Sequence, residues 1–227
     1  MAAELMRILC CAVAAVALLP AAPLFASPKK VKQAVLACPA DVRALLAPFA
    51  KVRGVSVDFT EEKHIALLAK PVVNRGRILF LAPDQLVRRV EEPTPSAVWL
   101  RGTDLVVRDA AGERKLDVGR WGPANVLVSS FLYVLRGDVV SLLKHYDMTL
   151  TCEAPLWRLR LVPKDKGLGK LLGHLVISGR GDRPEVMEVL DGSGDRAITR
   201  FANEDRHAHP APADLEAFFR APAPGAK

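Results

Sequence analysis

The strongest constraint on the fold of this chain is a repeated two-residue alternation of apolar and polar side chains, interrupted at short intervals by turn residues. Val55, Val57 and Phe59 alternate with polar neighbours, and comparable segments recur as far as residue 201. Alternation with period two is typical of strands that bury one face. Short turns such as residues 102–104 join neighbouring segments directly. The pattern therefore predicts an antiparallel meander and not a series of parallel strand–helix–strand units.

Eleven segments fit this interpretation. They lie at residues 55–60, 75–81, 86–92, 96–101, 105–108, 113–118, 147–153, 157–162, 174–178, 185–190 and 197–201. Between the last two a Gly-Ser-Gly turn is expected, and residues 164–170 read as a basic loop.

Helical spacing replaces the alternation at the N-terminal side and in the middle of the chain. Residues 39–52 place five apolar side chains on one face, and Pro48 is expected to kink or shorten the end of that helix. Two central helices are predicted at 126–135, capped by Asn125, and at 139–145, capped by Asp138. Residues 214–219 predict a last short helix within a Pro/Ala-rich C-terminal tail, residues 207–227.

The N-terminal residues predict export. An uncharged apolar run at 8–19 follows Arg7 and precedes Pro20, Pro23 and the small residue Ala26. This order is typical of a secretory signal peptide, here residues 1–26 with cleavage near Ala26. The alternative is an uncleaved membrane anchor, but two prolines interrupt a run of marginal length. The mature protein is expected to be soluble.

The mature chain then contains two cysteines, Cys38 and Cys152. In an oxidising compartment they either pair as a disulfide or remain two unrelated buried thiols, and the sequence favours neither.

The composition argues against several function classes. There are 32 basic and 25 acidic residues, and the acidic residues are interleaved with the basic ones along the strands. The sequence shows no basic face with aromatic residues for base stacking, so it does not predict nucleic-acid binding. His207 and His209, beside Glu204 and Asp205, are the best metal candidates, yet they lack a third ligand at a recognisable spacing. No catalytic constellation is present. We expect no cofactor, no metal and no enzymatic activity.

Three segments carry a family resemblance: residues 57–63 (VDFTEEK), 76–80 (GRILF) and 82–86 (APDQL). With the export signal, the amphipathic helix and the order of strands and central helices along residues 38–203, they resemble a divergent branch of the LolA-type outer-membrane lipoprotein carrier family. The resemblance implies an α+β fold, an incomplete antiparallel β-barrel of about eleven strands with an N-terminal helix and a central helical lid, over residues 27–206.

The resemblance also implies a function. It predicts a monomeric periplasmic carrier that shields acyl chains of lipoproteins, or of another envelope lipid, in an apolar cavity on the way to the outer membrane. An inner-membrane donor complex and an outer-membrane acceptor would be its partners. Release of the cargo would require the helices at 125–145 to move. An envelope-stress sensor with the same lipid-binding fold is the alternative, and a secreted enzyme of unknown type is a third class.

The expected cavity residues follow from the assumed strand parity and from one face of the first central helix. Because a shift of one residue turns a whole strand over, the set depends on that parity. It comprises Val57, Phe59, Ile78, Phe80, Leu86, Arg88, Val90, Trp99, Val107, Phe131, Leu132, Leu135, Leu159 and Leu161.

The chain departs from the family pattern at three positions. Where the best-studied branch has an arginine that latches the lid, a phenylalanine and a tryptophan, this chain has Ala82, Leu86 and Arg88. The latch is therefore absent. Arg88 shares the parity of Leu86 and Val90, so it either meets a polar or anionic headgroup in the cavity or lies in solvent on an edge strand.

Overall fold

The computed structural model describes residues 38–102, 104–117, 122–206, 208 and 210–220. The predicted signal peptide, His207 and His209 lie outside these residues. The strands are β1 (Gly54–His64), β2 (Val72–Leu81), β3 (Gln85–Glu92), β4 (Ser96–Arg101), β5 (Asp104–Asp109), β6 (Gly112–Asp117), β7 (Tyr146–Glu153), β8 (Leu156–Pro163), β9 (Leu172–Arg180), β10 (Arg183–Asp191) and β11 (Arg196–Asp205). The helices are α1 (Val42–Leu46), the 3-10 turn η1 (Phe49–Lys51), α2 (Pro123–Leu135), α3 (Val139–His145), α4 (Lys166–Gly169) and α5 (Pro212–Arg220).

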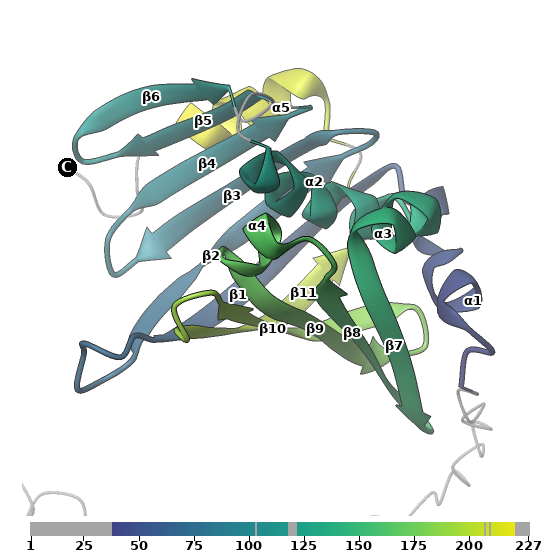
Figure 1. Ribbon diagram of the computed structural model, residues 1–227. Coiled ribbons are helices and arrows are strands. Elements are labelled where there is room, and N and C mark those ends of the chain that lie inside the picture. The colour runs from purple at the N-terminus through teal and green to yellow at the C-terminus, as the bar shows by residue number, and fades with distance from the viewer. Residues whose placement is uncertain (1–37, 103, 118–121, 207, 209, 221–227) are drawn as a thin grey trace, which may run out of the picture. The chain divides into compact units, whose positions relative to one another are not determined.

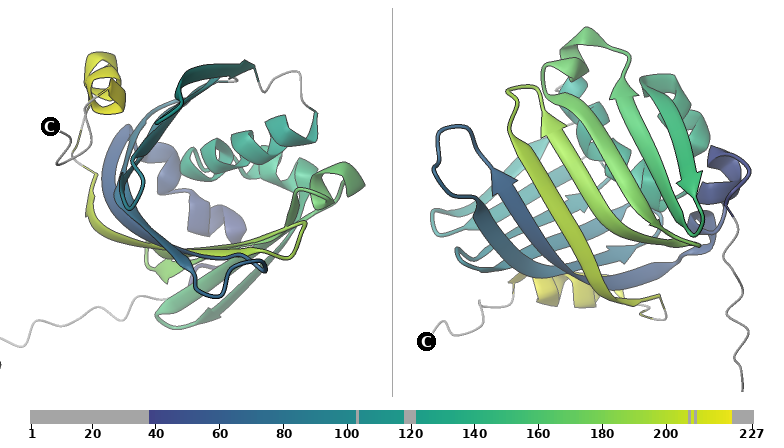
Figure 2. Two further views of the ribbon diagram at one scale, coloured as in Figure 1. Left: turned by 90° about the vertical axis from the view of Figure 1, so that its left-hand side faces the viewer. Right: turned by 90° about the horizontal axis from the view of Figure 1, so that it is seen from below.

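All eleven strands form one antiparallel sheet in the order β6-β5-β4-β3-β2-β1-β11-β10-β9-β8-β7. The first and last strands of the chain, β1 and β11, pair in the middle of the sheet. The sheet is strongly curved and has a concave face (Figures 1 and 2). Its ends, β6 and β7, are not paired with each other in the described part of the chain, which confirms the incomplete antiparallel barrel.

The connection from β6 to β7 contains α2 and α3, and both lie on the concave side of the sheet (Figure 2). Asp138 is the N-cap of α3, as predicted: its carboxylate accepts from Ser141 N at 3.0 Å. The predicted cap of α2 is wrong, because that helix already begins at Pro123. Asn125 lies in its first turn and accepts instead from the Ser129 hydroxyl at 3.0 Å.

Two further helical expectations are corrected or refined by the structure. The predicted helix at 39–52 is interrupted at Pro48, which separates α1 from η1 because proline cannot donate the hydrogen bond that would continue a helix. The predicted basic loop at 164–170 contains the short helix α4, whose N-cap Asp165 accepts from Leu168 N at 2.8 Å.

Helix α5 packs on the opposite, convex side of the sheet against β3 and β4 (Figure 2). Leu215 and Phe219 are buried there among Val87 and other outward side chains of these strands. The Phe219 ring lies 5.5 Å from the Trp99 ring, between centroids. The outer face of β3 and β4 is therefore covered by α5.

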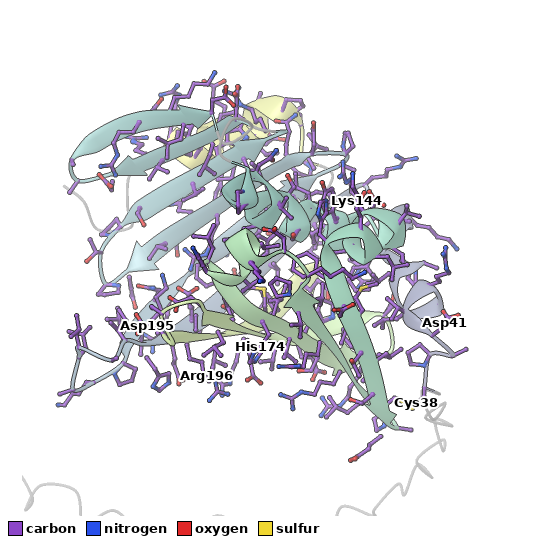
Figure 3. All side chains as sticks on the ribbon, in the orientation of Figure 1. Cys38, Asp41, Lys144, His174, Asp195 and Arg196 are labelled. Atoms are coloured by element: carbon purple, nitrogen blue, oxygen red, sulfur yellow. A yellow bond between two sulfur atoms is a disulfide. The ribbon has the colours of Figure 1, made fainter. Side chains whose placement is uncertain are left out.

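A disulfide joins Cys38 to Cys152, so that the start of the described chain is tied to the end of β7 (Figure 3). The two cysteines are 114 residues apart in the sequence, and the bond encloses most of the sheet.

Candidate functional site

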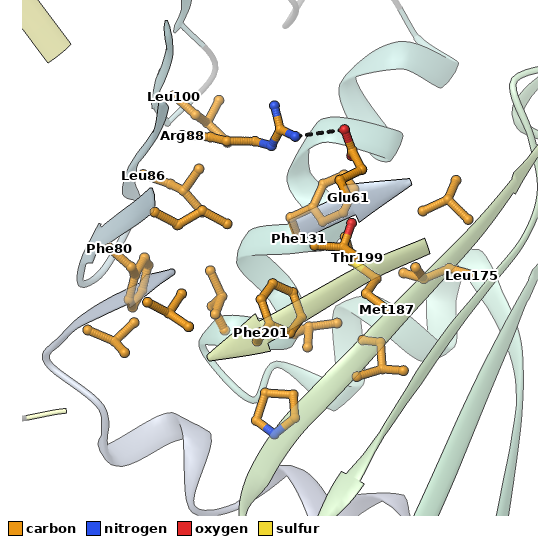
Figure 4. Close-up of a pocket in the computed structure, with 18 of the residues that line it drawn as sticks. Glu61, Phe80, Leu86, Arg88, Leu100, Phe131, Leu175, Met187, Thr199 and Phe201 are labelled. Atoms are coloured by element: carbon orange, nitrogen blue, oxygen red, sulfur yellow. Dashed lines mark hydrogen bonds and ion pairs between the residues drawn. The ribbon is translucent and has the colours of Figure 1, made fainter. Parts of the chain in front are cut away.

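The inner side of the curved sheet and the inner face of α2 leave a cavity of about 500 Å³ between them. This volume lies within the usual range of small-molecule sites. The apolar side chains that line it are Phe49, Val52, Val55, Val57, Ile78, Phe80, Leu86, Val98, Leu100, Leu105, Val128, Phe131, Val134, Leu135, Leu175, Ile177, Pro184, Met187, Val189, Ala197 and Phe201. The polar ones are Glu61, Lys63, Arg88, Thr199, Glu204 and Arg206. Figure 4 shows how the labelled side chains converge from the strands and, for Phe131, from α2.

Helix α2 forms the cover of the cavity. Val128, Phe131, Val134 and Leu135 recur at helical spacing and face the space below. Leu132, in contrast, is buried among Val55, Phe80, Leu100 and their neighbours, and it anchors the helix to strands β1 to β4.

The cover is held in place by packing and by a buried pair of hydroxyl groups. Ser130 Oγ of α2 lies 2.6 Å from the hydroxyl of Tyr146, the first residue of β7, and it donates to Val126 O at 2.5 Å. Burial raises the pKa of the Tyr146 hydroxyl above its ordinary value. At the position of the family's latch arginine, Ala82 packs into the apolar cluster of Leu132.

The turn between α2 and α3 also fixes the cover. Gly137 has a φ of +63°, and a Cβ there would lie 2.5 Å from Leu46 O of α1. Only glycine combines this conformation with such a close approach. The turn therefore seats the α2–α3 unit directly on α1.

Ser130→Ala is expected to lower the free energy of unfolding by about 1–3 kcal/mol, because it leaves the Tyr146 hydroxyl buried without its partner. Urea denaturation measures the change. The matched control is Ser129→Ala, which removes a half-buried hydroxyl one residue away and is expected to cost less than about 1 kcal/mol. Equal costs for the two variants would show that the Ser130–Tyr146 contact does not hold the cover.

The upper end of the cavity in Figure 4 carries a charged cluster. Glu61 Oε2 of β1 accepts from Arg88 Nη2 of β3 at 2.8 Å and from Asn74 Nδ2 of β2 at 2.9 Å, and Lys63 Nζ lies 3.5 Å away. The Arg88 guanidinium is 4.3 Å from the centroid of the Phe59 ring. Burial lowers the pKa of Arg88, and Glu61 opposes that shift.

A second group of charges lies near the first residues of β1. Arg206 pairs with Glu204, and its Nη1 lies 2.6 Å from Asp182 Oδ2. Its guanidinium is 6.0 Å from the centroid of the Phe49 ring. One cation and two carboxylates meet here, so this group carries one more negative than positive charge.

The structure brings half of the predicted cavity residues together. Those that line the cavity are Val57, Ile78, Phe80, Leu86, Arg88, Phe131 and Leu135. Phe59 lies under Arg88, and Leu132, Leu159 and Leu161 are buried by neighbouring side chains of the core. Val90 and Val107 lie on the inner face of the sheet but do not line the cavity. Val107 is paired with the lining residue Val98. Val90 is paired with Gly76, which is in turn paired with Phe59.

The expectation for Trp99 is wrong. Trp99 lies on the convex face against Phe219, and its strand neighbours Val98 and Leu100 line the cavity. The prediction exchanged the inner and outer residues of β4 because this strand is apolar on both faces. Its outer face is apolar because α5 covers it.

The prediction missed the lining residues of β9, β10 and β11. Seven of them fall at odd positions: Leu175, Ile177, Met187, Val189, Ala197, Thr199 and Phe201. The other two, Pro184 and Glu204, lie at even positions. The same two-residue periodicity that located the strands was available to find them. Glu61 and Lys63 were overlooked because charged side chains were not expected on the inner face.

No helix in the described part of the chain is long and apolar enough to cross a membrane. Within the same residues, no group of three or more His, Cys, Asp or Glu side chains is arranged to hold a metal ion.

A curved antiparallel sheet with an apolar hollow under a helical cover defines a binding protein for apolar ligands. The family described as "outer membrane lipoprotein carrier protein LolA-like" matches residues 34–218, and the chain belongs to this family. This match confirms the resemblance found in the sequence. No curated protein sequence matches the chain.

Solved structures with a similar fold have low sequence identity. A LolA superfamily protein from Nitrosomonas europaea is 13% identical with a TM-score of 0.41, covering 77% of this chain and 96% of its own. The MucA/MucB complex of Pseudomonas aeruginosa gives 15% identity and a TM-score of 0.46, covering 78% of this chain and 60% of the matched chain. LprF from Mycobacterium bovis gives 10% and 0.34, covering 72% and 92%.

Proposed function

We propose that this protein is a periplasmic carrier that holds the acyl chains of a lipoprotein, or of another envelope lipid, in its cavity and moves them towards the outer membrane. The observation that carries the proposal is the 500 Å³ cavity, whose wall is apolar except for six side chains. Membership of the LolA-like family supports a lipoprotein-binding or carrier role. The role is one of binding and transfer, without covalent chemistry.

The free energy of burying an acyl chain is consistent with a carrier that binds its cargo and releases it. Each methylene group removed from water contributes about 0.8 kcal/mol, so eight buried methylenes contribute about 6 kcal/mol. By itself this contribution corresponds to a dissociation constant in roughly the tens of micromolar, and the costs of association weaken the binding further, so the cargo is held reversibly. Since α2 covers the cavity, uptake and release require this helix to move away from the sheet. A donor complex at the inner membrane and an acceptor at the outer membrane belong to the same proposal.

Export to the periplasm is also part of the proposal. The signal-peptide pattern of residues 1–26 supports it, and so does the Cys38–Cys152 disulfide, because such bonds persist in oxidising compartments.

A variant with a filled cavity tests the proposal. Ala197→Phe places a large ring on the inner face of β11, where Ala197 lines the cavity. We expect it to weaken the binding of a fluorescent fatty-acid probe by tenfold or more, because the ring takes the space of the acyl chain. The matched control is Ala202→Phe on the exposed outer face of the same strand, which should bind like the wild type.

Native mass spectrometry of protein purified from the periplasm complements the probe. Co-purified acylated species, lost in Ala197→Phe and retained in Ala202→Phe, would support the carrier. Absence of such species together with no uptake of the probe by the wild type would contradict it.

A further inference from the structure

The charged cluster at Arg88 differs from the rest of the cavity wall in having excess positive charge. Two cations, Arg88 and Lys63, share a single carboxylate, Glu61, at 2.8 and 3.5 Å. At the other charged group, Arg206 is matched by both Glu204 and Asp182. The two charged groups therefore differ in net charge: the group at Arg88 is net positive, and the group at Arg206 is not.

The two groups are separated by an apolar stretch. Asp205 lies between Glu204 and Arg206 in the chain, and its register partner on β1 is Ser56. Ser56 precedes Glu61 by five residues, which corresponds to about 17 Å of extended chain. Between them Val57 of β1 lines the cavity, and Phe59 is buried on the same face of the strand under the Arg88 guanidinium. This arrangement suits a ligand with one polar head and a long apolar tail, with its head at the Arg88 end.

Arg88 has hydrogen-bond donors that Glu61 does not use and that are available to a ligand. Its guanidinium offers five N–H donors in a planar fork. Glu61 engages Nη2, and within the described ranges no other carboxylate is paired with Arg88. The side chain is 26% exposed and the Lys63 side chain 43%, so both cations are reachable from outside the packed core.

The surroundings strengthen the attraction of an anion. Leu86 and Leu100 flank Arg88 in the cavity wall (Figure 4), and the Phe59 ring holds the guanidinium plane from one side. In an environment of low dielectric constant, a charge pair is stronger than in water. A planar guanidinium also binds phosphate and carboxylate groups through two parallel hydrogen bonds.

We propose that the cavity takes a lipid whose head is an anion, a phosphate or a carboxylate, and that Arg88 with Lys63 binds this head while the acyl chain fills the apolar stretch. The inference rests on the proposed function, because it assigns the cargo class of the same cavity. Glu61 pairs with Arg88 in the structure, and the anionic head of the ligand competes with Glu61 for that arginine.

The experiment compares lipids that share one acyl chain and differ in the head. The probes are hexadecanoate, lysophosphatidate with a hexadecanoyl chain, the neutral monoacylglycerol with the same chain, and inorganic phosphate alone. Calorimetric titration of delipidated protein at neutral pH, below the micelle concentrations, measures each affinity. We expect the wild type to bind the two anionic lipids about tenfold or more tightly than the neutral one.

Three variants assign the effect to Arg88. Arg88→Met keeps the apolar stem and should remove the preference for anionic lipids, so that their affinities fall to about that of the monoacylglycerol. Glu61→Gln removes the competing charge and should increase the preference. Arg77→Met, an exposed outer-face arginine paired with Asp58, makes the same change in net charge and should leave the preference intact.

The outcomes separate this inference from the function on which it rests. Equal affinities for all three lipids, or a preference that survives in Arg88→Met, would overturn the anionic cargo and leave the carrier standing. Failure of all three lipids to bind would overturn the carrier itself. Binding of inorganic phosphate as tight as that of lysophosphatidate would also refute the inference, since the site would then recognise free phosphate.

Discussion

Replacing both Cys38 and Cys152 by serine is expected to lower the free energy of unfolding by about 5 kcal/mol. The disulfide closes a loop of 114 residues, and in the chain-entropy account a cross-link of this length removes about that much from the unfolded state. For a domain of this size the melting temperature should fall by about 10–20 °C. Thermal unfolding followed by circular dichroism measures the shift.

Reduction of the wild type provides the control for that experiment. A reducing agent should lower the melting temperature of the wild type to that of the double serine variant and leave the variant itself unchanged. This comparison also accounts for Cys10 and Cys11, which the variant retains wherever the N-terminal segment is present. A wild type that is insensitive to reduction and as stable as the variant would show that the two cysteines do not pair in solution.

Glu61→Ala is expected to lower the free energy of unfolding by about 3 kcal/mol. Glu61 is 8% exposed, and its Oε2 accepts from both Arg88 and Asn74. Removing one partner of a buried ion pair leaves the other charge without compensation. The partial exposure of Arg88 keeps the expected value at the lower end for such pairs.

A double-mutant cycle distinguishes this explanation from simple loss of packing. Arg88→Met in the Glu61→Ala background removes the uncompensated charge and should recover at least half of the lost stability. The coupling is measured from urea denaturation of the wild type, the two single variants and the double variant. Additive losses would mean that Glu61 and Arg88 do not interact in solution.

The strands were predictable because the signal for them is local. Alternation of period two and intervening turns located all eleven strands, and Asp138 was correctly assigned as a helix cap. On β1 the inner face carries Val55, Val57 and Phe59 and the outer face carries polar residues, so the parity that placed Val57 in the cavity was readable from the sequence.

The same signal failed where both faces of a strand are apolar. On β4, Ala97 and Trp99 pack under α5, while Val98 and Leu100 face the cavity. The sequence alone does not distinguish the two faces, because the burial of the outer one depends on a helix that follows more than 100 residues later in the chain. Similarly, Leu159 and Leu161 face inwards but are covered by the core around Leu142 and Tyr146.

What the sequence by itself determined is therefore the set of strands, the two-sided character of the sheet and the family. These depend on the order of neighbouring residues along the chain. Only the tertiary structure decided that Cys38 meets Cys152, that α2 leaves a hollow beneath it, and that Glu61 and Arg88 share one end of that hollow. Each of these depends on the distance between residues remote in sequence, which is set by how the sheet curves and where its helices come to rest.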